Sequence, residues 1–134
     1  MDVSLHHVAV VTADLERSIA FYAGVLGLRR LARPAFSTAG AWFAAGPLKV
    51  HIILTPHGTF RAAPVVDIAD VHFAMNTPDF EAAVLELKAK GYSEDFPPGD
   101  AKSMVILRSS PAGFAQAYLL DPDNNVVEIN AALE

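Results

Sequence analysis

The chain has 134 residues, of which 52% are hydrophobic and 19% are charged, and its formal net charge at pH 7 is −5. This composition predicts one globular domain spanning residues 1–134, and the acidic balance argues against nucleic acid as a partner. The chain contains no cysteine, which excludes disulfides and thiolate zinc sites, and no apolar run approaches the roughly 20 residues of a membrane span. Residues 1–4 carry no basic leader, so we expect a cytoplasmic protein.

The first half is predicted to begin with a strand at about 5–12, followed by a helix. Apolar residues at near-helical spacing predict that helix, namely Leu15, Ile19, Tyr22 and Leu26. Thr12 or Asp14 is its candidate N-cap, and Gly27 is typical of a helix C-terminus. Three short strands are expected to follow, at about 28–33, 40–45 and 48–54.

The second half has the same pattern. A strand is expected at about 70–76, and then a helix that buries Phe80, Val84 and Leu87 and ends at Gly91, with Thr77 or Asp79 as its N-cap. Further strands are expected at about 92–96, 115–120 and 125–130, and "SMVIL" (103–107) is a candidate for one more. "DPDNN" (121–125) predicts a hairpin turn, with Asn124 or Asn125 suited to positive φ.

The two halves are an internal repeat. "HVAVVTADLERSIAFY" from His7 matches "HFAMNTPDFEAAVLEL" from His72 at five of sixteen positions. "KVHII" (49–53) matches "VVEIN" (126–130), which places His51 over Glu128. We therefore predict an α+β fold of two βαβββ modules, with the first module at 1–56, a linker at 57–69 and the second module at 70–134.

The repeat places four metal-capable side chains at equivalent positions. His7 and His72 lie in the first strand of each half, and His51 and Glu128 lie in the last. If the halves pack about a pseudo-twofold axis, the four converge on a site suited to a divalent Zn, Ni, Fe, Co or Mn ion. A single histidine in an apolar strand is more often a core or edge residue, and Glu128 has the alternative of the solvent face of an edge strand.

Several other residues are candidates for substrate contacts. Aromatic side chains could line an apolar wall or belong to the core: Phe36, Trp42 and Phe43. Gln116 and Tyr118 lie two apart on one face of a predicted strand and offer an amide and a phenol. Arg108 and Lys102, on the irregular segment 97–112, could receive an anionic substrate.

Three phrases resemble the vicinal oxygen chelate superfamily, the group of glyoxalases, bleomycin- and fosfomycin-resistance proteins and extradiol dioxygenases. They are "LHHVAVVTADLERSIAFYAGVLGL", "VHFAMNTPDFEAAVLELKAKG" and "AYLLDPDNNVVEIN". The resemblance implies paired βαβββ modules forming a cupped mixed sheet around a metal, with His7, His72 and Glu128 at ligand positions and His51 at the fourth. Members of this superfamily often form dimers, so the resemblance also implies a homodimer.

The resemblance favours a metal-dependent lyase or isomerase that acts on a small oxygenated substrate, with His51 and Glu128 as catalytic residues. Glyoxalase I carries a glutamate where His51 stands, so here a neutral histidine or a metal-bound hydroxide would abstract the proton. The alternatives are an Fe(II) extradiol-type dioxygenase, with His51 as an acid/base beside a two-histidine, one-carboxylate site, and a non-catalytic binding protein of the bleomycin-resistance type.

Overall fold

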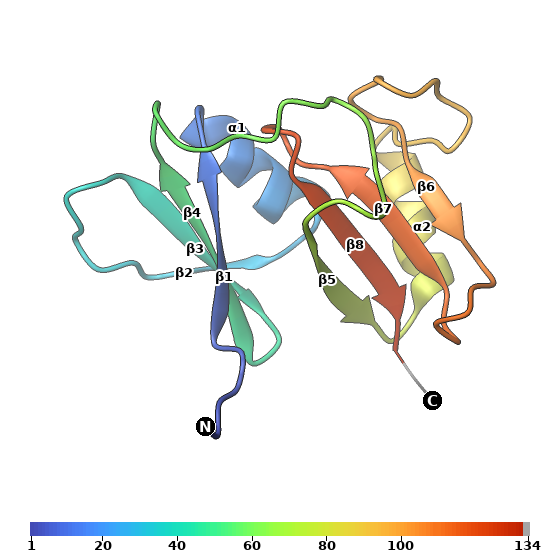
Figure 1. The fold of residues 1–134 in the computed structure, drawn as a ribbon, viewed down its shortest axis with the longest axis horizontal. Coiled ribbons are helices and arrows are strands. Elements are labelled where there is room, and N and C mark those ends of the chain that lie inside the picture. The colour runs from blue at the N-terminus through green and yellow to red at the C-terminus, as the bar shows by residue number, and fades with distance from the viewer. Residues whose placement is uncertain (133–134) are drawn as a thin grey trace. The chain divides into compact units, whose positions relative to one another are not determined.

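The computed structural model describes residues 1–132, and the chain consists of two compact modules, Met1–Phe60 and Arg61–Glu134 (Figure 1). The first module contains β1 (His7–Thr12), α1 (Leu15–Ile19), η1 (Ala20–Val25), β2 (Arg29–Leu31), β3 (Gly40–Ala45) and β4 (Leu48–Leu54). The second contains β5 (His72–Thr77), α2 (Phe80–Ala89), β6 (Val105–Leu107), β7 (Gln116–Leu120) and β8 (Val126–Ala131). The predicted α+β class and the βαβββ pattern of both modules are confirmed.

The two sheets have the same topology. The strand order is β1-β4-β3-β2 in the first and β5-β8-β7-β6 in the second, with one parallel pair in each and the remaining pairs antiparallel. In the parallel pairs, Ala9 lies opposite His51 and Ala74 lies opposite Glu128. The equivalence of His51 and Glu128, expected from the sequence repeat, is thus present in the strand register.

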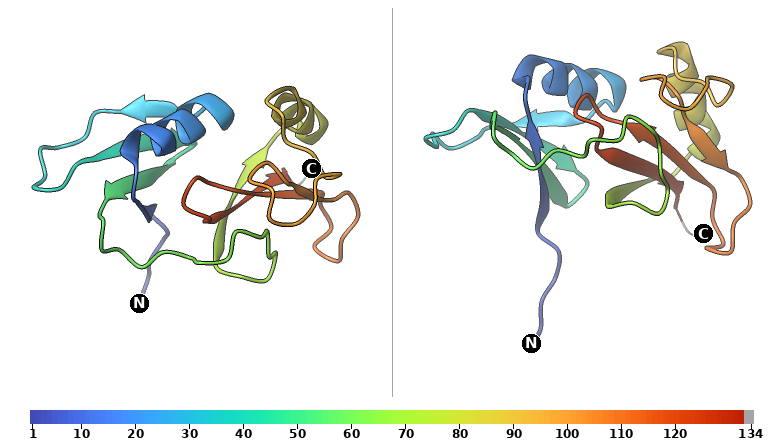
Figure 2. Two further views of the ribbon diagram at one scale, coloured as in Figure 1. Left: turned by 90° about the horizontal axis from the view of Figure 1, so that it is seen from above. Right: turned by 45° about the horizontal axis from the view of Figure 1, so that its top comes forward.

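Each sheet has a helix-covered face and an opposite face, called here the open face, on which Val66 packs against a cluster that includes Tyr118 and Val126 in the second module. Figure 2 shows α1 and η1 against one face of the first sheet and α2 against one face of the second. In the first module Phe43, Val50 and Ile52 are fully buried, and Tyr22 contacts Phe43 with ring centroids 6.0 Å apart. In the second, Phe80 and Val84 of α2 pack on Ala117. Phe43 therefore belongs to the core, and the expectation that it lines an apolar wall with Trp42 is wrong.

The first helix differs from the prediction. α1 ends after five residues and continues as a π-helical segment, η1, in which the amide of Leu26 donates to the carbonyl of Phe21 over 3.0 Å. Phe21 and Tyr22, which are adjacent in this segment, are both buried. Gly27, at φ 67°, ends the segment as expected.

The predicted strand at 92–96 is wrong, and its place in the sheet is taken by β6 from the "SMVIL" segment. Ser93 forms only an isolated bridge with Ser103. Pro97 and Pro98 follow immediately, and proline has no N–H to donate to a ladder. The "DPDNN" turn is confirmed, with Asn124 at φ 66° and the Asp121 carboxylate accepting hydrogen bonds from the backbone amides of Asp123 and Asn125.

Both helices begin at equivalent N-caps. Asp14 accepts a hydrogen bond from the amide of Arg17, and Asp79 accepts one from the amide of Ala82. Within residues 1–132, none of the helices is both long enough and apolar enough to cross a membrane.

We expect Asp79→Ala to lower the free energy of unfolding by about 1 kcal/mol, because the first turn of α2 loses its side-chain acceptor. Urea unfolding followed by circular dichroism measures the change. Asp79→Asn is the matched control, since asparagine caps equally well and should retain most of the stability. Equal losses in the two variants would contradict the capping role.

Candidate functional site

The open faces carry the candidate site residues. Two residues that are paired in neighbouring strands have their side chains on the same face of the sheet, so the strand register shows which residues share a face. On the first sheet this face carries side chains of β1, β3 and β4: His7, Trp42, Lys49 and His51. On the second sheet it carries the equivalent set from β5, β7 and β8: His72, Gln116, Tyr118, Glu128 and Asn130.

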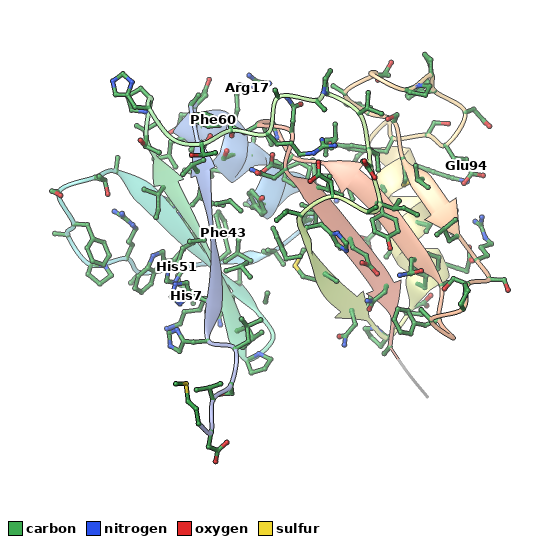
Figure 3. The ribbon with its side chains drawn as sticks, viewed as in Figure 1. His7, Arg17, Phe43, His51, Phe60 and Glu94 are labelled. Carbon is green, nitrogen blue, oxygen red and sulfur yellow. The ribbon has the colours of Figure 1, made fainter. Side chains whose placement is uncertain are left out.

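In the first module three rings form a continuous stack. The ring of His51 lies between those of His7 and Trp42, with centroid distances of 4.0 and 4.2 Å and interplanar angles of 16° and 6°. Figure 3 shows His7 and His51 close together on β1 and β4. Nδ1 of His7 is 2.8 Å from Nδ1 of His6, so one of these nitrogens carries the shared proton and Nε2 of His7 is outside this bond. The stack brings together two of the predicted metal ligands.

His51 is buried, and its Nε2 has no hydrogen-bond partner among the described residues. Burial lowers the pKa of this imidazole, and the neighbouring His7 and Lys49 lower it further. The neutral ring therefore predominates at pH 7. A neutral imidazole with an uncommitted nitrogen suits either a metal ion or a substrate proton.

In the second module His72 and Glu128 form a pair. Nε2 of His72 lies 3.1 Å from Oε2 of Glu128, and Nδ1 of His72 lies 2.7 Å from the carbonyl oxygen of Asp70. A carbonyl only accepts hydrogen bonds, so Nδ1 carries a proton. In the neutral ring the lone pair is then on Nε2, on the side of the carboxylate. Two acceptors facing each other are stable only with a cation between them, either a proton or a metal ion.

Glu128 is only 4% exposed, and its carboxylate is held by amides. Oε1 accepts hydrogen bonds from Nε2 of Gln116 over 2.9 Å and from Nδ2 of Asn130 over 3.3 Å. Nε2 of Gln116 also donates to the phenol oxygen of Tyr118 over 2.9 Å. Burial, together with the charge of Glu128, raises the pKa of the Tyr118 phenol. These contacts fix the carboxylate and leave Oε2 directed at His72.

Arg61 holds the backbone that presents this pair. Its Nε donates to Asp70 over 2.6 Å, and this hydrogen bond holds the pKa of the Asp70 carboxyl below its usual range. Its two terminal nitrogens donate to the carbonyl oxygens of Ala63, Val65 and Asn124. Arg61 therefore joins the segment before β5 to the turn before β8, from which His72 and Glu128 respectively extend.

The donor chemistry of both pairs fits a divalent transition metal. Each pair supplies two nitrogen or oxygen donors of the types that Zn, Fe, Mn or Ni accept, and the orphan Nε2 of His51 and the oriented Nε2 of His72 are ready as ligands. The structure brings together His7 with His51, and His72 with Glu128. Within residues 1–132 it contains no group of three or more histidine, aspartate or glutamate side chains placed to hold a metal ion.

The other predicted contacts divide into two kinds. Trp42, Gln116 and Tyr118 lie on the open faces beside the pairs. Arg108 instead bonds to Glu81 of α2 over 3.1 Å, on the helix-covered side, and Lys102 donates to the carbonyl of Lys90.

Sequence reasoning missed Asn130, Lys49, Asp70 and Arg61. Asn130 and Lys49 each lie two residues from a predicted ligand in the same strand, and this period-two spacing could have identified them. No sequence pattern marks Asp70 or Arg61.

We expect Arg61→Gln to lower the free energy of unfolding by about 2 kcal/mol, because carbonyl oxygens of two loops lose a charged donor. Chemical denaturation measures the loss. Arg108→Gln is the control with the same charge change, and its solvent-exposed ion pair should matter little. A loss in Arg108→Gln as large as that in Arg61→Gln would contradict this role of Arg61.

Comparison with known proteins identifies one protein family and several solved structures with a similar fold. The model of the Glyoxalase/Bleomycin resistance protein/Dioxygenase superfamily matches residues 4–129. No curated protein matches the sequence.

Among solved structures, a glyoxalase family protein from Bacillus anthracis is 20% identical with a TM-score of 0.76, covering 99% of this chain and 98% of that one. A lactoylglutathione lyase from Agrobacterium tumefaciens is 18% identical with a TM-score of 0.69, covering 98% and 96%. The fosfomycin resistance protein FosX from Listeria monocytogenes, in a mutant complexed with Mn(II) and a dihydroxypropylphosphonic acid, is 15% identical with a TM-score of 0.70, covering 99% and 95%. At these identities the likeness concerns the fold.

Proposed function

The chain belongs to the Glyoxalase/Bleomycin resistance protein/Dioxygenase superfamily, and from this premise we propose that it is a metal-dependent enzyme of the lyase or isomerase type acting on a small oxygenated molecule. The observation that carries the proposal is the His72–Glu128 pair. Nδ1–H of His72 donates a hydrogen bond to the carbonyl oxygen of Asp70, so the lone pair of Nε2 and the carboxylate face each other and are suited to share a cation. FosX, which has this fold, is described with Mn(II), in keeping with a divalent metal.

In this proposal His7, His72 and Glu128 hold the ion. His51 is either the fourth ligand or the base next to it, because its Nε2 is buried and uncommitted within the described part of the chain. A divalent cation in such a site supplies a Lewis acid that polarises substrate oxygens and makes a neighbouring carbon more acidic.

The chain itself would contribute orientation and proton transfer. As a base, neutral His51 would accept a proton from a substrate carbon beside a carbonyl group, and the stacked rings of His7 and Trp42 would hold its plane in place. Glu128 would contribute a carboxylate whose direction is set by Gln116 and Asn130. Gln116, Tyr118 and Trp42 are the proposed substrate contacts, and Arg108 remains a weaker candidate because Glu81 already engages it.

We expect the protein, purified without an affinity tag under anaerobic conditions, to hold about one divalent metal ion per chain. Glu128→Gln should weaken metal affinity by about tenfold or more, because a charged ligand becomes neutral. His57→Ala is the control, since His57 is exposed and lies outside both pairs. Metal content by elemental analysis and competition with a chelator measure both quantities. Unchanged affinity in Glu128→Gln would remove Glu128 from the ligand set.

A substitution at His51 separates its two roles. If His51 is the base, His51→Ala keeps the metal and loses turnover by about a hundredfold or more. If it is the fourth ligand, the same variant loses metal affinity by about tenfold or more. Full affinity together with full turnover would exclude both roles.

The same material distinguishes the alternative functions. Bound iron with catechol-dependent oxygen consumption would replace the lyase by an extradiol-type dioxygenase. Ligand binding that survives complete chelation, with no metal taken up on titration, would indicate a binding protein. A homodimer and a cytoplasmic location also remain predictions, and light scattering and cell fractionation test them.

A further inference from the structure

We propose that the open face of the first module contains a subsite for the acid group of a small organic acid, formed by Arg33 and Lys49 on either side of Trp42. The proposal rests on the proposed function in one respect, that this organic acid is the substrate of the same site. Binding of the acid by the first module does not depend on turnover or on a bound metal, so it can be tested without either.

The guanidinium of Arg33 lies against Gly40 of β3. A Cβ atom at Gly40 would clash with the backbone oxygen of Ile52 and would also come within 2.9 Å of both Cζ and Nε of Arg33, so only glycine allows this approach. Gly40 is two residues from Trp42 in β3 and therefore shares its face. Gly40 also corresponds to Gln116, because Gly40 pairs with Ile53 as Gln116 pairs with Asn130. A cation thus lies in the first module where an amide lies in the second.

The guanidinium is held in place and still has a donor to offer. One terminal nitrogen donates to the carbonyl of Thr38 over 2.9 Å, and Cζ lies 4.7 Å from the ring centroid of Phe36. Nε is buried and makes no hydrogen bond within residues 1–132. A buried donor without a partner costs free energy, which an acceptor on a bound ligand would restore.

Lys49 lies on the other side of Trp42. It pairs with Ala44, two residues beyond Trp42, and its Nζ lies 5.4 Å from the Trp42 ring centroid. The two cations therefore flank the indole that stacks on His51. Between them they place positive charge on both sides of the surface next to the catalytic ring.

This positive charge has no counterion within the described first module. Neither Arg33 nor Lys49 forms an ion pair in the described part of the chain. Residues 1–60 contain five basic and three acidic residues, and the acidic ones are Asp2 near the N-terminus, the N-cap Asp14 and its neighbour Glu16. An anionic substrate is what brings such a site towards neutrality.

The carbon skeleton of the acid would be flat and apolar. Phe36 is 53% exposed, and its ring centroid lies 6.0 Å from that of Trp42. An aromatic side chain left open beside two cations offers stacking area to a ring that carries a carboxylate or phosphonate. The geometry therefore favours an aromatic acid over an aliphatic or cationic molecule.

Trp42 is the only tryptophan, so its fluorescence reports on this subsite directly. We would titrate the full chain with mandelate and with mandelamide, which keeps the ring and hydroxyl but lacks the charge, first with metal supplied and then after chelation. We expect mandelate to bind about tenfold or more tightly than the amide, and Arg33→Gln combined with Lys49→Gln to remove most of that preference. Equal affinity for acid and amide in the unmodified chain, or no saturable response to the acid, would overturn the subsite.

Arg30→Gln in combination with Arg17→Gln removes the same charge away from the open face and should keep the preference, which controls for net charge. Thermal unfolding of each variant confirms that it is folded. If only the proposed function fails, the chain takes up no metal but still binds mandelate more tightly than mandelamide. Metal uptake without preference for the acid overturns only the subsite.

Discussion

The parallel pairing of the first and last strand in each module is the constraint on which the candidate site depends. Hydrogen bonding between β1 and β4 fixes Ala9 opposite His51, and that between β5 and β8 fixes Ala74 opposite Glu128. A shift of one residue would turn His51 and Glu128 towards the helix and into the core. The buried Val50 and Ile52 on the other face of β4 make such a shift costly. The core therefore holds the polar side chains on the open face.

Much of this could be predicted because it follows from periodicity and from the repeat. The caps Asp14 and Asp79, the turn at Asn124 and the equivalence of His51 with Glu128 are all local or repeated signals. The strand expected at 92–96 failed because a short apolar run does not show whether a neighbour exists to pair with it. Arg33 could not be foreseen, since its position depends on the course of a loop.

The two open faces carry the same strand order but differ in how they satisfy their polar groups. Around Glu128 the hydrogen bonds close on one another, with Gln116 and Asn130 donating to one carboxylate oxygen. Around His51 the contacts are ring faces, and one nitrogen is left without a partner in the described chain. The second module thus fixes the position of the Glu128 carboxylate, whereas the first module leaves Nε2 of His51 without a hydrogen bond among the described residues.

The missing side chain at Gly40 has a consequence for how this protein can change. In the second module the residue above the sheet is encoded in the strand itself, at Gln116, and any replacement there disturbs the support of Glu128. In the first module the strand has a glycine at that position, and the guanidinium of Arg33, a loop residue, lies against it. Loops tolerate insertion and replacement far better than strands do. A replacement in the segment 32–39 therefore costs less stability than one at Gln116, and it leaves the sheet and its histidines in place.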